Sequence, residues 1–202
     1  MSGPRQIVVF DRVSADGYFS APDGSLNWVV PDPDIDKEGA AGVPGTGTLL
    51  FGRRTYDMFE KFWPNVQGDG PTAPDPHSPG RYTPEMRAFA AMINSAEKIV
   101  FSRTRQSVTW NNSRLIKELD PEEIRRLKEQ PGKSMMIFGS GSIVSQLTQQ
   151  RLVDEYHFIV GPMLLGGGKS LVGGVPSPTK LELVEAKPFA SGNIRLRYRL
   201  AA

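Results

Sequence analysis

The sequence contains no cysteine, which excludes a disulfide framework, a thiolate nucleophile and a thiolate metal site. It has only two histidines, and they are not spaced as a metal-binding pair, so we expect no metal site. It also lacks both a run of about 18 apolar residues and the apolar core of a signal peptide. We therefore expect a soluble cytoplasmic protein without membrane contact.

The chain has little excess of either charge. Lys and Arg number 24 against 22 Asp and Glu, and the two signs are interleaved along the sequence. This balance argues against an extended basic surface for nucleic acid but leaves small anionic ligands open. The 202 residues, 39% of them hydrophobic, are enough for a buried core, and we expect residues 1–202 to form a single domain.

Strand-like and helix-like segments alternate, which predicts an α/β layered domain. We expect strands at 7–10, 49–51, 98–101, 134–138 and 154–160, and helices at 54–62, at 84–95 after a capping Thr83, and from Asp120 to about 128. Alternation over 194–200, with 181–184 as its partner, predicts a C-terminal antiparallel hairpin. Residues 14–46 are interpreted as a long connection over a site, and 64–84 as a surface excursion.

The heptapeptide Phe51-Gly52-Arg53-Arg54-Thr55-Tyr56-Asp57 is typical of a strand, a glycine bend and a helix start. Unpaired N–H groups and the helix dipole stabilise an anion at such a start, and arginine adds a donor suited to phosphate. The alternative is a surface turn with solvated arginines. The heptapeptide alone does not decide between them.

A second such unit follows the strand at 134–138, where Gly139-Ser140-Gly141-Ser142 bends into a helix. The third glycine of the Rossmann fingerprint is absent, since Val144 stands at its position. Ser102-Arg103-Thr104 ends another strand. The three segments together indicate contacts with one extended polyphosphate ligand.

Several motifs in this order resemble the dihydrofolate reductase-like proteins, specifically the C-terminal reductase domain of the bifunctional riboflavin-biosynthesis deaminase/reductase. The matching pieces are Val13–Tyr18, Phe51–Tyr56, Lys98–Thr104, Phe138–Ser142, Leu152–Tyr156 and Pro162–Lys169. The resemblance implies a three-layer dihydrofolate reductase-like fold, with a central mostly parallel mixed sheet and helices on both faces. It also implies a homodimer.

The resemblance further implies NADPH as cofactor. Phosphates would lie at Gly52, Arg53 and Thr55, and the adenosine 2′-phosphate would meet Ser102 and Arg103, with help from Arg54. The pyrophosphate and nicotinamide ribose would pack along the second glycine unit, and two residues of the first strand would line the nicotinamide. The residues along the pyrophosphate and nicotinamide ribose would be Gly139, Ser140, Gly141, Ser142 and Ile143. The two that line the nicotinamide would be Val13 and Ser14.

The substrate side is less defined. Asp16, in the Ser-Ala-Asp-Gly turn, is the candidate for the catalytic residue and for a polar substrate contact, with a turn residue bonded to its own backbone as the alternative. Trp28 is a candidate wall for a flat heterocycle, and Asp32 and then Asp36 are further candidate contacts. Gly166–Lys169 is either a phosphate-binding nest or a tight loop.

We expect an NADPH-dependent reductase that transfers a hydride to a small heterocyclic substrate of riboflavin-precursor or pterin type. The cysteine ligands of a deaminase zinc site are absent, so only the reductase half is implied. The alternative is a protein that binds NADPH or another ligand without turnover.

Overall fold

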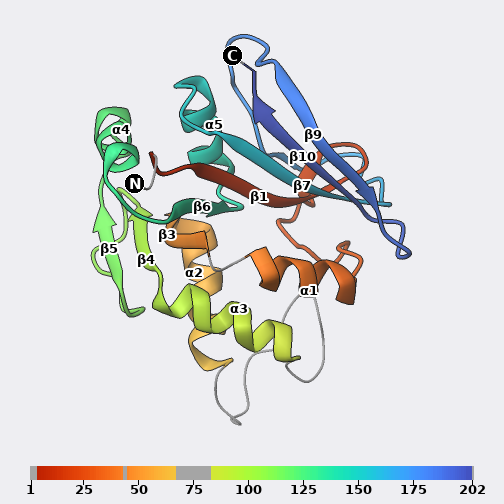
Figure 1. Cartoon of the computed structure of the whole chain (residues 1–202), viewed down its shortest axis with the longest axis horizontal. Coiled ribbons are helices and arrows are strands. Elements are labelled where there is room, and N and C mark those ends of the chain that lie inside the picture. The colour runs from red at the N-terminus through yellow and green to blue at the C-terminus, as the bar shows by residue number, and fades with distance from the viewer. Residues whose placement is uncertain (1–3, 43–44, 67–82, 202) are drawn as a thin grey trace.

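The computed structural model of the chain describes residues 4–42, 45–66 and 83–201. A single large sheet runs through the molecule, with α4 and α5 on one face and α1, α2 and α3 on the other (Figure 1). The helices are α1 (Pro33–Gly42), α2 (Arg53–Phe62), the 3₁₀ helix η2 (Trp63–Asn65), α3 (Pro84–Ser95), α4 (Pro121–Glu129) and α5 (Gly141–Gln149). The strands are β1 (Ile7–Ser14), β2 (Tyr18–Ser20), β3 (Thr46–Gly52), β4 (Glu97–Phe101), β5 (Ser113–Ile116), β6 (Ser134–Phe138), β7 (Glu155–Gly161), β8 (Lys169–Ser170), β9 (Leu181–Pro188) and β10 (Ile194–Leu200).

The strand order of the eight-stranded sheet is β5-β4-β3-β6-β1-β7-β10-β9. Pairing from β5 to β7 is parallel, and β10 pairs antiparallel with both β7 and β9. A short second sheet joins β2 to β8. The carboxyl ends of β1, β3, β4 and β6 therefore meet at one edge, where α/β proteins place their ligands. The predicted mostly parallel mixed sheet with a C-terminal hairpin is confirmed.

Each face of the sheet has its own core, because successive strand residues point to opposite faces. On β3, Leu50 packs with helices α4 and α5, whereas Leu49 and Phe51 pack with α2 and α3. On β4, Ile99 and Val100 divide in the same way. These strands are buried on both faces, as the central strands of a three-layer protein must be.

The predicted helix starts are confirmed where local capping fixes them. The side chain of Thr83 accepts a hydrogen bond from Met86 N and begins α3, and that of Asp120 accepts one from Glu122 N and begins α4. The predicted excursion at 64–84 is largely outside the described residues. What is described of it is the end of η2, Val66, Thr83 and the first residue of α3.

The segment at 14–46 was predicted to be a connection, but it also has regular structure. It contains β2 and helix α1, and α1 begins at Pro33 because Asp32 Oδ1 accepts hydrogen bonds from the N–H groups of Asp34 and Ile35. Strand β5 was not predicted, and β1 extends four residues beyond the predicted end at Phe10. Strand β5 widens the central sheet beside β4, and the added residues of β1 lengthen it at its carboxyl edge.

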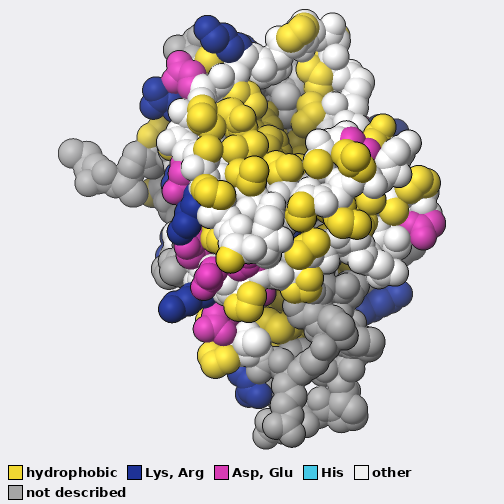
Figure 2. All heavy atoms as spheres, turned by 90° about the vertical axis from the view of Figure 1, so that its right-hand side faces the viewer, with side chains coloured by type: hydrophobic (Ala, Val, Ile, Leu, Met, Phe, Trp, Pro, Cys, Tyr) yellow, Lys and Arg dark blue, Asp and Glu magenta, His cyan; other side chains and the backbone are white. Residues whose placement is uncertain are grey.

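Hydrophobic side chains gather on the side of the molecule that Figure 2 shows. Among the large hydrophobic residues exposed on the surface are Leu183 and Val184 on β9, Ile194 on β10 and Leu164 after β7. The predicted homodimer stays a prediction, since one chain alone is described. Within the described residues, no helix combines the length and apolarity needed to cross a bilayer.

Candidate functional site

A cavity of about 950 Å³ opens at the carboxyl edge of the sheet. Its wall is built from the middle of β1, the ends of β3, β4 and β6, the starts of α2 and α5, and parts of α1, α3 and β8. A volume of this size suits a ligand larger than a single heterocycle. The site lies where the strands that lead into α2 and α5 end, as the glycine units predicted.

The two glycine units lie side by side and are bonded to each other. The hydroxyl of Ser140 accepts a hydrogen bond from Gly52 N at 2.9 Å and donates one to Thr55 Oγ1 at 3.0 Å. A Cβ on Gly139 would stand 3.2 Å from Thr55 Oγ1, and one on Gly52 would stand 3.4 Å from Ser140 Oγ. Glycine therefore allows the starts of α2 and α5 to approach closely on one wall.

The starts of α2 and α5 differ from those of the other described α-helices in how their N–H groups are satisfied. Asp32, Thr83 and Asp120 place a side-chain oxygen on the first turns of α1, α3 and α4, and each of these turns also carries acidic residues. Neither α2 nor α5 has a side-chain cap or an acid in its first turn. The two helices that face the cavity thus keep their N-terminal charge for an external anion.

Three arginines bring positive charge to the same wall. Arg53 and Arg54 open α2, and Arg103 follows β4. Arg53 lies 3.8 Å from Asp57 one turn along the helix, and Arg103 pairs with Glu118 at 3.2 Å, where both side chains are largely exposed. Exposed pairs of this kind contribute little, so the guanidinium groups remain available to a phosphate.

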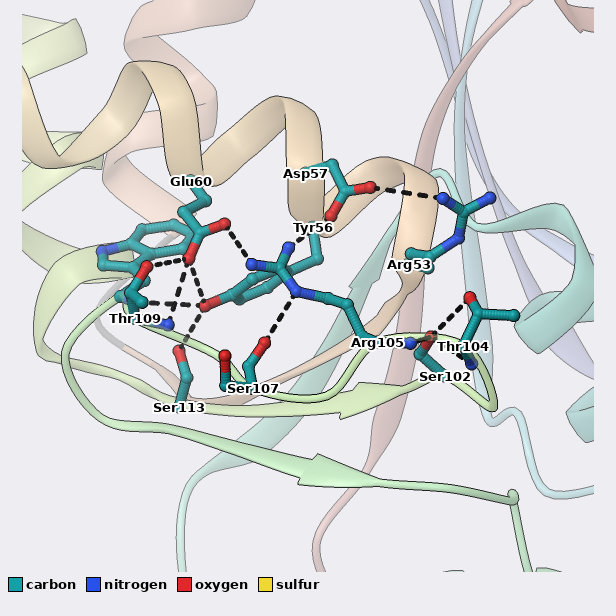
Figure 3. Close-up of polar contacts among 11 residues, drawn as sticks. Arg53, Tyr56, Asp57, Glu60, Ser102, Thr104, Arg105, Ser107, Thr109 and Ser113 are labelled. Atoms are coloured by element: carbon teal, nitrogen blue, oxygen red, sulfur yellow. Dashed lines mark hydrogen bonds and ion pairs between the residues drawn. The ribbon is translucent and has the colours of Figure 1, made fainter.

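Arg105 and Thr109 fasten the loop after β4 to helix α2, and Arg105 makes contacts with three residues of that helix (Figure 3). Its guanidinium donates to Asp57 and, at 2.7 Å, to Glu60, and it lies over the ring of Tyr56 with 4.7 Å to the centroid. Burial alone would raise the pKa of Glu60, but hydrogen bonds from Thr109 and Arg105 lower it to about 2. The network is therefore charged at neutral pH and holds the loop in place.

The loop held by Arg105 has an internal hydrogen-bonded turn. Ser102 Oγ accepts from Thr104 N at 3.3 Å and from Arg105 N at 3.0 Å. Ser102, Arg103 and Thr104 all line the cavity. The third segment that the sequence indicated thus reaches the same wall as the two glycine units.

The other half of the cavity is mostly apolar. Side chains from the loop before α1 and from α1, α2 and α3 form it, among them Val29, Ile35, Met58, Phe59, Met86 and Phe89. Two carboxyl groups flank this surface: Asp36, which accepts from Arg12 at 3.1 Å, and Glu85 at the start of α3. Burial raises the pKa of Asp36, against the opposing effect of Arg12. An aromatic ring with few polar groups fits such a surface.

One residue of the wall, Asp11 on β1, was missed by the sequence reading. The predicted strand ended at Phe10, so the position was not recognised as part of a buried strand. Asp11 is two residues beyond Val9, which is fully buried, and four beyond Ile7. The period-2 pattern would have indicated a carboxyl group on the same strand face as these core residues.

The predicted site residues divide into two groups. Ten of them line the cavity: Gly52, Arg53, Arg54, Thr55, Ser102, Arg103, Gly139, Ser140, Gly141 and Ser142. Six others are not among the lining residues: Val13, Ser14, Asp16, Trp28, Asp32 and Ile143. Ile143 is buried in the core behind the start of α5, and Trp28 packs against Gly161, where a Cβ would stand 3.5 Å from its ring.

Asp16 is occupied by contacts within the protein. Its carboxylate accepts hydrogen bonds from Ser14 Oγ at 2.6 Å, from Leu165 N at 3.1 Å and from Gly166 N at 2.7 Å. The bond from Ser14 and those backbone bonds hold the pKa of Asp16 below its usual value. The glycine-rich loop after β7 therefore uses its free N–H groups on Asp16, and the substrate-contact role of Asp16 stays a prediction.

Asp32 likewise has partners away from the cavity. Besides capping α1, it accepts a hydrogen bond from the hydroxyl of Ser191, in the turn between β9 and β10. Burial would raise its pKa, but the bonds from Ser191 and the helix start lower it. Asp32 ties α1 to the C-terminal hairpin, and its substrate role is also untested.

Comparison with known proteins places these features in a family. The family model described as "RibD C-terminal domain" matches residues 5–194. Uncharacterized protein YyaP of Bacillus subtilis is 27% identical over 194 residues, which are 96% of this chain and 94% of YyaP.

Solved structures show the same fold at lower identity. A provisionally named riboflavin biosynthesis protein of Shewanella sp. PV-4 superposes with a TM-score of 0.72 and 22% identity, covering 98% of this chain and 99% of that one. Dihydrofolate reductase from Enterococcus faecalis, complexed with NADP(H), superposes with a TM-score of 0.62 and 13% identity over the full length of both chains.

Proposed function

The chain belongs to the RibD C-terminal domain family, and from this premise we propose that it is an NADPH-dependent reductase of a small heterocyclic substrate. The observation that carries the proposal is the pair of uncapped helix starts at Arg53 and Gly141, which are hydrogen-bonded together through Ser140 on the wall of one cavity. An anionic group suits both starts, and the adjoining segment at Ser102–Thr104 gives room for an extended ligand with several phosphates, such as a pyridine dinucleotide.

The residues present fit the phosphates of such a ligand. The N–H groups at the start of α2 lie beside Arg53 and Arg54. At the start of α5, a Cβ on Gly141 would stand 3.1 Å from Phe19 and 3.3 Å from the carbonyl of Leu171, so a side chain there would be crowded. We assign the phosphates to these two helix starts, because both leave backbone donors open toward the cavity.

The 2′-phosphate of NADPH would meet Arg103 and Arg54, next to the turn that Ser102 closes. The Arg105 network supports this assignment, since it anchors the loop before any ligand arrives. A loop whose backbone is already held in place loses less freedom when it binds a phosphate. NADPH would therefore bind more tightly than NADH.

The apolar half of the cavity would hold the substrate. Met58 and Phe59 of α2, together with Phe89 of α3, offer flat and flexible contacts to a heterocyclic ring. The cofactor would supply the hydride, and the protein would bring the ring to it and exclude water. A riboflavin precursor or a pterin meets this description, as does an unphosphorylated imine.

Turnover separates this proposal from the alternative of a protein that only binds NADPH. NADPH oxidation, followed by absorbance, should depend on an added heterocycle from a panel of dihydrofolate, the ribosylaminopyrimidine precursor of riboflavin and unphosphorylated cyclic imines. Met58→Ala, in the cavity wall, should raise the KM for the accepted heterocycle. Leu183→Ala, exposed on β9, serves as the control and should leave it unchanged.

The outcomes point in different directions. A rate with at least one heterocycle, sensitive to Met58 and not to Leu183, supports the reductase. NADPH binding without oxidation across the whole panel would favour the binding protein instead.

A further inference from the structure

Asp11 occupies the point where the central strands part. Strand β1 pairs with β6 as far as Phe10, opposite Phe138, and with β7 as far as Ser14. Asp11 and Gly139 are therefore the next residues after a paired couple in two adjacent parallel strands, and both line the cavity. This register places the backbone of Asp11 next to that of Gly139, on the wall of the same cavity.

The carboxyl of Asp11 is only half satisfied. Its Oδ1 accepts a hydrogen bond from Arg12 N at 3.0 Å, while its Oδ2 is buried without a hydrogen-bond partner among the described residues. A buried acceptor without a donor is unfavourable for a carboxylate, whereas a protonated oxygen is itself a donor for a ligand. Burial raises the pKa of Asp11 to about 8.

The charged groups around the cavity do not replace that missing partner. Burial raises the pKa of Asp11, and the hydrogen bond from the Arg12 N–H opposes this rise. Asp36 is another carboxyl group of the cavity wall, and it already accepts a hydrogen bond from Arg12. The charged side chains that line the same cavity are Arg12 on β1, Asp36 on α1, Arg53 and Arg54 on α2, Glu85 on α3, Arg103 after β4 and Lys169 on β8.

We propose that Asp11 is the proton donor of the reduction, which rests on the proposed reductase function. Reduction of a C=N or C=O bond by NADPH adds a hydride to carbon and leaves NADP⁺, and the nitrogen or oxygen then needs one proton. The Oδ2–H bond of Asp11 breaks as the new N–H or O–H bond forms. The carboxylate that remains takes a proton from solvent before the next turnover.

Infrared difference spectroscopy of the whole protein tests the charge of Asp11 without any ligand. At neutral pH the wild type should show a carboxylic acid C=O band that disappears in Asp11→Asn. Asp34→Asn removes an exposed carboxyl of α1 and should leave the band in place. A spectrum in which Asp11→Asn changes no acid band at neutral pH would overturn the proposal.

Stability gives a second readout. A folded-state pKa of about 8 against 3.8 unfolded means that the folded protein holds this proton more tightly. The stability from that proton is fully present below about pH 4 and is lost as the pH rises through about 8. As the pH rises from about 4 to about 8, the urea resistance of Asp11→Asn should therefore increase relative to that of the wild type. A constant difference would contradict a proton held at this site.

Kinetics then tests the donor role itself. With the heterocycle that supports NADPH oxidation in the panel, Asp11→Asn should lower kcat about 100-fold or more and lose the fall in rate above about pH 8, while NADPH still quenches the protein fluorescence. Wild-type rates in Asp11→Asn would overturn the donor role and leave the reductase intact. No oxidation by either protein would overturn the function as well, and the infrared band would separate that failure from a failure at Asp11.

Discussion

Removing the hydroxyl of Ser140 is the sharpest perturbation of the junction between α2 and α5. In Ser140→Ala the buried N–H of Gly52 loses its acceptor at 2.9 Å, and Thr55 loses its donor. A buried backbone N–H left unpaired costs about 1–3 kcal/mol, and the second bond adds about 1 kcal/mol. We expect Ser140→Ala to lower the free energy of unfolding by about 2–4 kcal/mol.

Ser140→Gly separates the hydrogen bonds from the backbone conformation. Ser140 has φ 60° and ψ 52°, in the left-handed region that glycine adopts without cost. The glycine variant loses the same two hydrogen bonds but is relieved of that strain, which outweighs the extra freedom of its unfolded chain. It should be about 0.5–1 kcal/mol more stable than Ser140→Ala.

Urea unfolding followed by circular dichroism measures both variants, with the midpoint shift converted through a common slope. Ser142→Ala is the control, because Ser142 is exposed and its side chain forms no hydrogen bond with the described residues. It should stay within about 0.5 kcal/mol of wild type. A similarly small loss in Ser140→Ala would refute the claim that this hydroxyl joins the two helix starts.

Two further substitutions test other parts of the account. Arg53→Ala should weaken NADPH binding by about 1.5–3 kcal/mol in calorimetry, the range for a hydrogen bond to a charged group, and Arg125→Ala on α4 should not; equal affinity in all three proteins would place the phosphate elsewhere. Gly168→Ala should lower stability by about 2–4 kcal/mol, because φ is +146° and a Cβ would stand 2.2 Å from the carbonyl of Ser20. Gly173→Ala, with nothing within 4 Å of its Cβ, should be nearly neutral, and a neutral Gly168→Ala would argue against the pairing of β2 with β8.

Local signals predicted the parts of the fold that local chemistry decides. Capping by Thr83 and Asp120, the glycine bends and the alternation over 194–200 depend on neighbours within a few residues, and each predicted element is present. Helix α1 was missed because Pro31 and Pro33 indicate a break, although Asp32 before Pro33 is also a helix-start signal.

Contacts between segments far apart in the sequence limited how much of the site could be predicted. Asp16 was chosen from its turn sequence, but Leu165 and Gly166, about 150 residues away in the chain, supply the N–H groups that bind it. No local pattern indicates that partnership. Asp11 was missed for a different reason: the strand was ended too early, so its place on the core face was not considered.

The predicted family and fold are confirmed, and they support membership of a dihydrofolate reductase-like family of reductases. Substrate choice depends on the apolar half of the cavity, and cofactor choice depends on how Arg54, Ser102 and Arg103 meet a ligand; neither the motif order nor the fold determines these contacts. These side chains line the same wall. Binding measurements with the two cofactors therefore test the roles of Arg54, Ser102 and Arg103.

A fluorescence titration of the wild-type protein with NADPH and with NADH tests the central claim most directly, since Trp63 lies in the cavity wall and reports on its occupation. If the starts of α2 and α5 hold one pyridine dinucleotide and the Arg103 loop meets its 2′-phosphate, NADPH should quench saturably and bind about 10–100-fold more tightly than NADH. Equal affinity for the two would remove the role of the Arg103 loop, and no saturable quenching by either would contradict the account at its base.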